Sequence, residues 1–345
     1  MKKVILTVGI ILLALGSIAQ TKQGSGGCDP VTESEYKWVE EVTEASTAVS
    51  GMKKLSQDNL DIRGAPTVSS DGSFIVFSGK EKMEETATNY YHLWKVSKVG
   101  GSLSKITGEQ VSDYLPCLTP DSTHIIFTSA RRGTNYELWK TSVRGIGGLT
   151  KLFGTGMHND LYPDISPDGS KILFVNQRVY GYETKKENTM WMMNINGSDL
   201  TQLRPGTAPR WAPDGEKIIF EYEDNIWVMN QDGSEVTKLT NDNKSHAPYW
   251  SPDGKKICYH SDQTGNFDIW MIGADGATQL TQNLSADLNP VWASDGLIYF
   301  ITNRGTGIFT LWSMKPIGYT SQPLPKKKAE TSQPPQKPAP DKEEE

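Results

Sequence analysis

The chain has 345 residues, and its 35 lysines and arginines against 41 aspartates and glutamates give a formal net charge of −6. This acidic balance argues against a nucleic-acid partner, because domains that bind nucleic acid normally present a basic face. The length suits one large core or two modest ones.

The N-terminal residues have the composition of an export signal. Two lysines precede an apolar run over residues 4–19, which has the length of a signal h-region and is short for a membrane span. One interpretation is a signal peptide of residues 1–19, with cleavage before Gln20 and release of a soluble protein. The other is a lipoprotein signal of residues 1–27, with acylation of Cys28. Both predict an exported protein, in the periplasm or associated with the outer membrane.

A linker over residues 20–51 follows the leader. Tyr36, Val39 and Val42 recur within it at roughly helical spacing, which predicts a short helix over residues 33–49. This helix would dock on the domain that follows.

Six copies of one motif occupy the centre of the chain. Each copy has a proline and, five residues later, an aspartate that is followed by glycine in five of the six. The pairs are Pro66/Asp71, Pro116/Asp121, Pro163/Asp168, Pro209/Asp214, Pro248/Asp253 and Pro290/Asp295. Successive prolines lie 39 to 50 residues apart, the length of a four-stranded propeller blade.

The rest of each copy predicts three more strands. A β-rich run follows every Asp-Gly turn, a third strand is centred on a tryptophan, and a fourth follows it. The tryptophans are Trp94, Trp139, Trp191, Trp227, Trp270 and Trp312. We expect the tryptophans to pack between blades and the aspartates to form turns through bonds to the backbone.

Only five fourth strands follow their own copies. The sixth, residues 52–56, lies before the first copy and matches residues 236–240 position for position. Because an unpaired strand edge is a liability, this N-terminal strand should complete the last blade. The sequence therefore predicts an all-β fold, a six-bladed β-propeller of four-stranded blades over residues 52–316. The Pro/Lys/Glu-rich residues 317–345 are predicted to be a disordered tail.

The repeated Pro-x-Trp-Ser-Pro-Asp-Gly pattern, followed by a strand and Ile-Trp-x-Met, resembles the TolB-like six-bladed β-propeller family. The best copies are residues 208–229 and 247–272, and the resemblance covers about residues 52–316. The resemblance implies the fold, without the α/β domain that precedes the propeller in true TolB.

Patterns typical of catalysis or cofactor binding do not occur in the sequence. It has no G-x-S-x-G elbow, H-E-x-x-H motif, Walker loop, C-x-x-C pair or EF-hand loop, and its five histidines lack metal-ligand spacing. We therefore predict no catalytic residues, no cofactor and no metal. Cys117 and Cys258 fall in different copies and are predicted to be buried thiols rather than a disulfide.

One face of the predicted ring has a distinctive composition. Because strands alternate in direction, the loops between second and third strands share a face with the links into each new blade. These links carry Asp113, Asp160 and Asp287, with Ser245 and His246 at the fifth blade. The aspartates either cap the inner strands or form an acidic rim at the channel mouth, suited to a cation or a basic partner.

The two longest loops are predicted on the same face, in the first and third blades. The second-strand phenylalanine and the third-strand tryptophan lie 17 residues apart in both. Their contact-type residues are Tyr90, Tyr91, Arg178, Tyr180 and Tyr182. Tyrosine and arginine are enriched among the residues that dominate binding energy, so these loops are predicted to contact a partner.

Two functions follow as hypotheses. The first is a non-catalytic, monomeric binding scaffold that recognises a protein or peptidoglycan-linked partner through the long-loop face. The alternative is a carbohydrate lyase or hydrolase with its site at the channel mouth. Histidine, arginine and carboxylate side chains converging there would favour the enzyme.

Overall fold

The computed structural model describes residues 48–82, 90–145, 148–180 and 185–319. The leader with Cys28, most of the predicted helix, Tyr182 and most of the tail lie outside these ranges. Within them the regular structure consists of 24 β-strands, and no helix could span a membrane.

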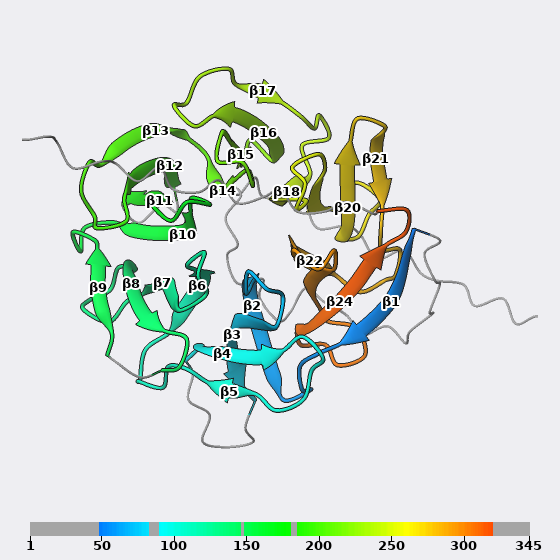
Figure 1. Cartoon of the computed structure of the whole chain (residues 1–345), viewed down its shortest axis with the longest axis horizontal. Coiled ribbons are helices and arrows are strands. Elements are labelled where there is room, and N and C mark those ends of the chain that lie inside the picture. Colours follow the sequence, from blue (N-terminus) through cyan, green and yellow to red (C-terminus); the bar gives the residue numbers. More distant parts are fainter. Residues whose placement is uncertain (1–47, 83–89, 146–147, 181–184, 320–345) are drawn as a thin grey trace, which may run out of the picture.

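The strands form six antiparallel sheets of four strands each, arranged as blades around a central axis (Figure 1). In every blade the first strand lies nearest the axis and the fourth lies at the rim. The six-bladed β-propeller predicted from the repeats is therefore confirmed.

The blades are numbered in chain order. Blade 1 contains β2 (Leu60–Val68), β3 (Phe74–Glu81), β4 (His92–Ser97) and β5 (Ser104–Lys105); blade 2 contains β6 (Asp113–Leu118), β7 (His124–Ser129), β8 (Glu137–Ser142) and β9 (Thr150–Phe153); blade 3 contains β10 (Asn159–Ile165), β11 (Lys171–Tyr180), β12 (Lys185–Asn194) and β13 (Thr201–Pro205). Blade 4 contains β14 (Thr207–Trp211), β15 (Lys217–Tyr222), β16 (Asn225–Asn230) and β17 (Thr237–Lys238); blade 5 contains β18 (Ser245–Trp250), β19 (Ile257–Ser261), β20 (Asp268–Gly273) and β21 (Gly276–Gln279); blade 6 contains β22 (Asp287–Trp292), β23 (Ile298–Thr302), β24 (Thr310–Pro316) and β1 (Val49–Lys54).

The ring closes through β1, which pairs with β24 as the outer strand of blade 6 (Figure 1). The predicted closure is confirmed, although the strand begins at Val49 rather than Met52. Val49 is therefore the first residue of a strand, whereas it was predicted to be the last residue of a helix. Leu55, just after β1, still donates its backbone N–H to Leu311 at 2.8 Å, and its side chain is buried in the core between blades 6 and 1.

A cross-strand aromatic pair stabilises each blade. The second strand contributes a fully buried ring that lies opposite the third-strand tryptophan in the register. The pairs are Phe77↔Trp94, Phe127↔Trp139, Phe174↔Trp191, Phe220↔Trp227, Tyr259↔Trp270 and Phe300↔Trp312. Such pairs are the unit of sheet stabilisation. Five of the six tryptophans, all but Trp270, also belong to hydrophobic clusters that join neighbouring blades, as predicted.

The turn aspartates bind their own backbone. Asp71 Oδ1 accepts the backbone N–H of Ser73 at 2.9 Å and the hydroxyl of Ser69 at 2.7 Å. These hydrogen bonds lower the pKa of Asp71 to about 2. The following glycine has φ between 67° and 81° in five blades, and in blade 2 Ser122 adopts φ 57° at the same place.

Each inner strand contains a β-bulge beside its proline. The register shifts there in all six blades, and in blades 2 to 6 the residue before proline has a positive φ. These residues are Leu115, Tyr162, Ala208, Ala247 and Asn289. A bulge changes the direction in which the side chains on either side of it point. Residues before the proline and residues after it therefore contact different parts of the ring.

Packing corrects the predicted start of the tail and confirms the predicted state of the cysteines. Tyr319 lies in the segment predicted to be tail, yet its ring packs on Trp292 with 4.4 Å between centroids, and its hydroxyl donates to Asp253 at 3.0 Å. The ordered domain therefore continues beyond Pro316. Cys117 and Cys258 are buried free thiols, as predicted.

Candidate functional site

The mouth face is the side of the ring that carries the connections between second and third strands and the links into the next inner strand. The register places these segments together, since Asp113 at the start of β6 lies opposite Ser129 at the end of β7. The predicted site residues within the described ranges all lie on this side of their blades.

A repeated hydrogen bond ties each blade to the next on this face. The backbone carbonyl three residues before each third-strand tryptophan accepts an N–H from the start of the following inner strand, at 2.8 to 3.2 Å. The accepting residues are Tyr91, Tyr136, Asn188, Asp224, Phe267 and Phe309. Four of the six are aromatic, so a carboxylate at Asp224 departs from the pattern of the ring.

The predicted acidic rim is replaced by buried, partnered carboxylates. Asp113 is fully buried and bonds Arg131 at 2.6 Å, while Asp287 is fully buried and accepts two bonds from Arg304 at 2.8 and 2.9 Å. Asp160 is buried and accepts a hydrogen bond from the Asn176 amide at 2.8 Å. Burial raises the pKa of Asp160 to about 6. These groups stabilise the starts of inner strands, which is the first of the two interpretations given above.

The predicted loop residues occupy different environments. Tyr91 is buried, and its hydroxyl donates to Asp61 at 2.6 Å, whereas Tyr90 is half-buried. Arg178 is exposed, but it and Tyr180 belong to β11, which pairs with β12 up to the Tyr180↔Lys185 pair. Most of the predicted long loop of blade 3 is thus strand, because the pairing between β11 and β12 continues further than the corresponding pairing in the other blades.

A strip of tyrosines lies across blades 1 and 2 and is here called the tyrosine strip: Tyr91, Tyr114 and Tyr136. Sequence reasoning found Tyr91 but missed Tyr114 and Tyr136. Their ring centroids lie 5.1 Å (Tyr91 to Tyr114) and 5.8 Å (Tyr114 to Tyr136) apart. Lys80 lies over the Tyr91 ring at 5.2 Å, and Arg63 donates to the Tyr91 hydroxyl at 3.2 Å. The signal available in the sequence was position in the repeat, because Tyr91 and Tyr136 both lie three residues before a third-strand tryptophan.

His246 is the predicted residue with the most reactive surroundings. Its Nδ1 lies 3.1 Å from Glu221 Oε1 and 4.0 Å from Asp224 Oδ1, at the boundary between blades 4 and 5. Burial lowers the pKa of His246, but the hydrogen bond and charge of Glu221 outweigh it, and the net shift is upward. Glu221 and Asp224 were not predicted. They are the described residues that could hold a metal together with His246.

On the side of the bulges away from the mouth face, a largely buried ion pair, with both side chains 13% exposed, connects residues of four blades. Asp164 of β10 bonds the Arg210 guanidinium of β14 at 3.2 Å and accepts the Trp211 backbone N–H at 2.8 Å. Cys117 of β6 lies 3.9 Å from the same carboxylate, and Arg210 lies over the Tyr249 ring of β18 at 5.5 Å. Because both members of the pair have further partners in neighbouring blades, the pair fixes the relative positions of the inner strands.

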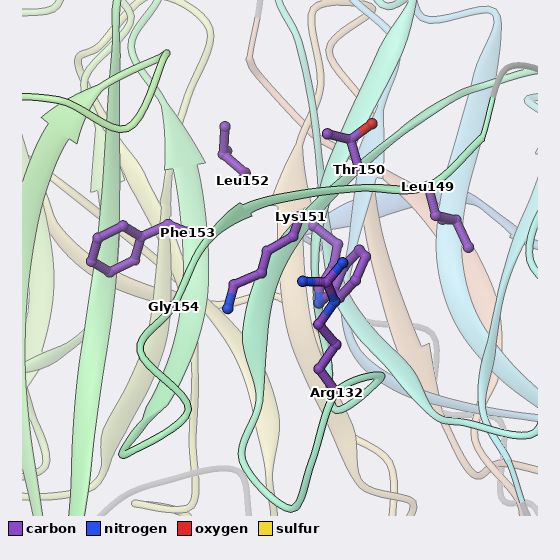
Figure 2. Close-up of a pocket in the computed structure, with 8 residues that line it drawn as sticks. Arg132, Leu149, Thr150, Lys151, Leu152, Phe153 and Gly154 are labelled. Atoms are coloured by element: carbon purple, nitrogen blue, oxygen red, sulfur yellow. The ribbon is translucent and has the colours of Figure 1, made fainter.

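An open cavity of about 600 Å³ lies at the outer edge of blade 2. Arg132, Trp139 and the strand β9 with its flanking residues line it, and Figure 2 shows Arg132 and Lys151 on one side of β9 with Leu152 on the other. The Lys151 ammonium bonds Glu137 at 2.6 Å, and Arg132 lies over the Trp139 ring at 5.6 Å. None of the predicted site residues lines this cavity.

Comparison with known proteins agrees with the fold. Residues 204–340 match the TolB beta propeller domain family. An uncharacterized protein of Agrobacterium fabrum is 27% identical over 114 residues, which cover 30% of this chain and 38% of that protein. TolB from Acinetobacter baumannii superposes with a TM-score of 0.54 at 19% identity, over 65% of this chain and 60% of TolB.

Enzymes share the architecture as well. Oligogalacturonate lyase from Vibrio parahaemolyticus superposes with a TM-score of 0.54 at 12% identity, over 82% of this chain and 97% of the lyase. Identities this low show the fold alone. The chain covers under two thirds of the Agrobacterium protein and of Acinetobacter TolB. With its ring of six four-stranded blades, the chain is a six-bladed β-propeller, and its residues 204–340 are similar to the TolB beta propeller domain family.

Proposed function

We propose that the protein is an exported, non-catalytic binding scaffold whose mouth face recognises a protein or peptidoglycan-linked partner in the cell envelope. The tyrosine strip is the observation that carries this proposal. Tyr114 and Tyr136 are half-buried, so each ring keeps an accessible part while its packing holds it in place. Rigid aromatic groups of this kind lose little conformational entropy on binding and dominate many interfaces.

Two exposed apolar side chains lie on the same face of the ring. Met157 and Leu284, in links of the mouth face, are 73% and 66% exposed. Methionine, tyrosine and arginine are enriched in interface cores, while lysine and aspartate are depleted there. Because Asp113 and Asp287 are buried, these two aspartates present no negative charge to a partner.

Partner capture from envelope extracts tests the proposal. Tyr114→Ala and Tyr136→Ala should each weaken capture by about 2 kcal/mol, roughly thirtyfold, as truncation of an interface aromatic does. Val99→Ala is the matched control, since Val99 is 65% exposed in the β4–β5 turn on the opposite face. Capture that is unchanged in the tyrosine double variant, with an unchanged melting temperature, would show that the mouth face of blades 1 and 2 binds no partner.

The enzyme remains a second candidate because of one observation, the convergence of Glu221, Asp224 and His246 on the mouth face. A carbohydrate lyase or hydrolase could use such a group for proton transfer or through a bound metal. This candidate predicts loss of turnover on an oligosaccharide from His246→Gln alone, with partner capture intact. The scaffold predicts no turnover to lose.

A further inference from the structure

We infer that Glu221, Asp224 and His246 form a binding site for a divalent transition-metal ion such as zinc, bridging blades 4 and 5 on the mouth face. The inference goes beyond the binding function proposed above and does not depend on the tyrosine strip. It rests on donor geometry, on the charge of the site and on the way the fold fixes each donor.

The three donors have the separations that an ion requires. One atom from each side chain lies within 4.8 Å of the others, with His246 Nδ1 at 3.1 Å from Glu221 and at 4.0 Å from Asp224. Ligand bonds of about 2.0 to 2.2 Å in a tetrahedral site place donors about 3.4 Å apart. The His246–Asp224 separation of 4.0 Å exceeds this value by about 0.6 Å, so the Asp224 carboxylate has to move toward the other two donors to complete the set.

Apart from His246 itself, no basic side chain pairs with the carboxylates of the cluster among the described residues. Elsewhere on the mouth face the carboxylates Asp113 and Asp287 each bond an arginine. Among the residues that the structure describes, no lysine or arginine forms an ion pair with Glu221 or Asp224. Asp262 places a third negative charge near Asp224 and His246, and the Lys244 ammonium lies 3.9 Å from the Asp262 carboxylate. A bound cation would relieve this repulsion.

Backbone contacts hold the Glu221 carboxylate and the Asp224 main chain against the strand that carries the histidine. The second oxygen of Glu221 accepts the Ala247 N–H at 3.1 Å, which leaves Oε1 directed at His246. The Asp224 carbonyl accepts the Ser245 N–H at 2.9 Å, in the repeated bond between blades. The site is thus held by the same contacts that hold blade 4 to blade 5.

Ligand chemistry and exposure define the class of ion. An imidazole nitrogen with two carboxylates suits zinc and its neighbours, whereas calcium and magnesium prefer all-oxygen sites. Glu221 is 8% exposed and His246 22%, but the Asp224 side chain is 44% exposed. Three protein ligands and an open side leave a coordination position for water or for a group from a partner.

Calorimetric titration of the chelator-treated full chain with zinc tests the inference, with cobalt absorbance as a second readout of the ligand set. We expect one ion per chain. His246→Gln and Asp224→Asn should each weaken zinc binding at least tenfold, because each removes one of three ligands. His158→Gln and Asp232→Asn are matched controls on residues outside the cluster, and both should bind like the unaltered chain.

Melting of the metal-free variants separates ligand loss from misfolding. Asp224 is nearly half exposed, so Asp224→Asn should melt like the unaltered chain and decides the question if His246→Gln folds poorly. Absence of a saturable one-to-one zinc site would overturn the inference. So would equal zinc affinity in Asp224→Asn and the unaltered chain, or calcium binding as tight as zinc binding.

Discussion

Removal of the strand that closes the ring is the most direct test of the architecture. A chain that begins at Gln57 lacks β1 and Leu55, whereas a chain that begins at Ala48 keeps both. The shorter chain loses the ladder between β1 and β24, the Leu55 N–H bond to Leu311 at 2.8 Å and the Ser56 hydroxyl that accepts the Leu311 N–H at 2.9 Å. It also exposes the whole outer edge of β24.

Two contributions set the magnitude. About five hydrogen bonds at about 1 kcal/mol each are lost, and the missing Leu55 side chain, 4% exposed in the core, adds about 2 kcal/mol or more. The sum, about 7 kcal/mol, is comparable to the whole stability of a typical domain. We therefore expect the chain that begins at Gln57 to melt about 14 to 28 °C lower, at about 2 to 4 °C per kcal/mol, or to fail to fold.

Thermal and urea unfolding, followed by circular dichroism, provide the measurement. Leu55→Ala in the full chain should lower stability by about 2 to 5 kcal/mol, while Met52→Ala, on an exposed residue of β1, should stay within about 0.5 kcal/mol. Equal melting temperatures for the chains that begin at Ala48 and Gln57 would refute closure by β1.

Two further predictions concern buried charges. Burial and the nearby charge of Asp287 raise the pKa of Asp268 to about 7, so the folded chain binds a proton that the unfolded chain lacks between about pH 4 and pH 7, and stability falls as pH rises through that window. Asp268→Asn should remove this slope and raise stability at pH 8 by a few kcal/mol, at about 1.4 kcal/mol per pKa unit; parallel urea-midpoint profiles from pH 5 to pH 8 would contradict it. Asp164→Ala should cost about 3 to 5 kcal/mol because Arg210 stays buried without its partner, and adding Arg210→Met should restore much of that loss; a cost of the single change below about 1 kcal/mol would show that the pair is not desolvated.

The ring and its closure could be predicted because each repeat encodes its own blade locally. An Asp-Gly turn, a β-rich run and a tryptophan lie within one repeat, so the sequence specifies strands and register without reference to other blades. The closing strand was found for the same reason, as a copy of a local pattern at a displaced position. The start of this strand at Val49 was missed because the ends of a strand depend on where its partner strand ends, not on the strand propensity of the local residues.

The mouth face could be located but its side chains could not be assigned. Asp113 is buried by Arg131, which lies 18 residues further along, and no local pattern shows that they meet. Contacts between blades are more distant still, with 25 residues between Glu221 and His246 and 46 between Asp164 and Arg210. Such pairs depend on which faces neighbouring blades present to each other. The repeats specify that the blades are adjacent, not which side chains meet between them.

The closing strand also determines how the domain responds to mechanical force. Val49 lies opposite Pro316, and the Ile317 N–H bonds the Ala48 carbonyl at 2.8 Å, so the chain enters and leaves the domain at the same end of the β1–β24 pair. A pulling force applied at these two points opens the pair from that end, one hydrogen bond at a time, instead of shearing all of the bonds together. Once Tyr319 has been pulled from Trp292, we therefore expect blade 6 to open before the other blades.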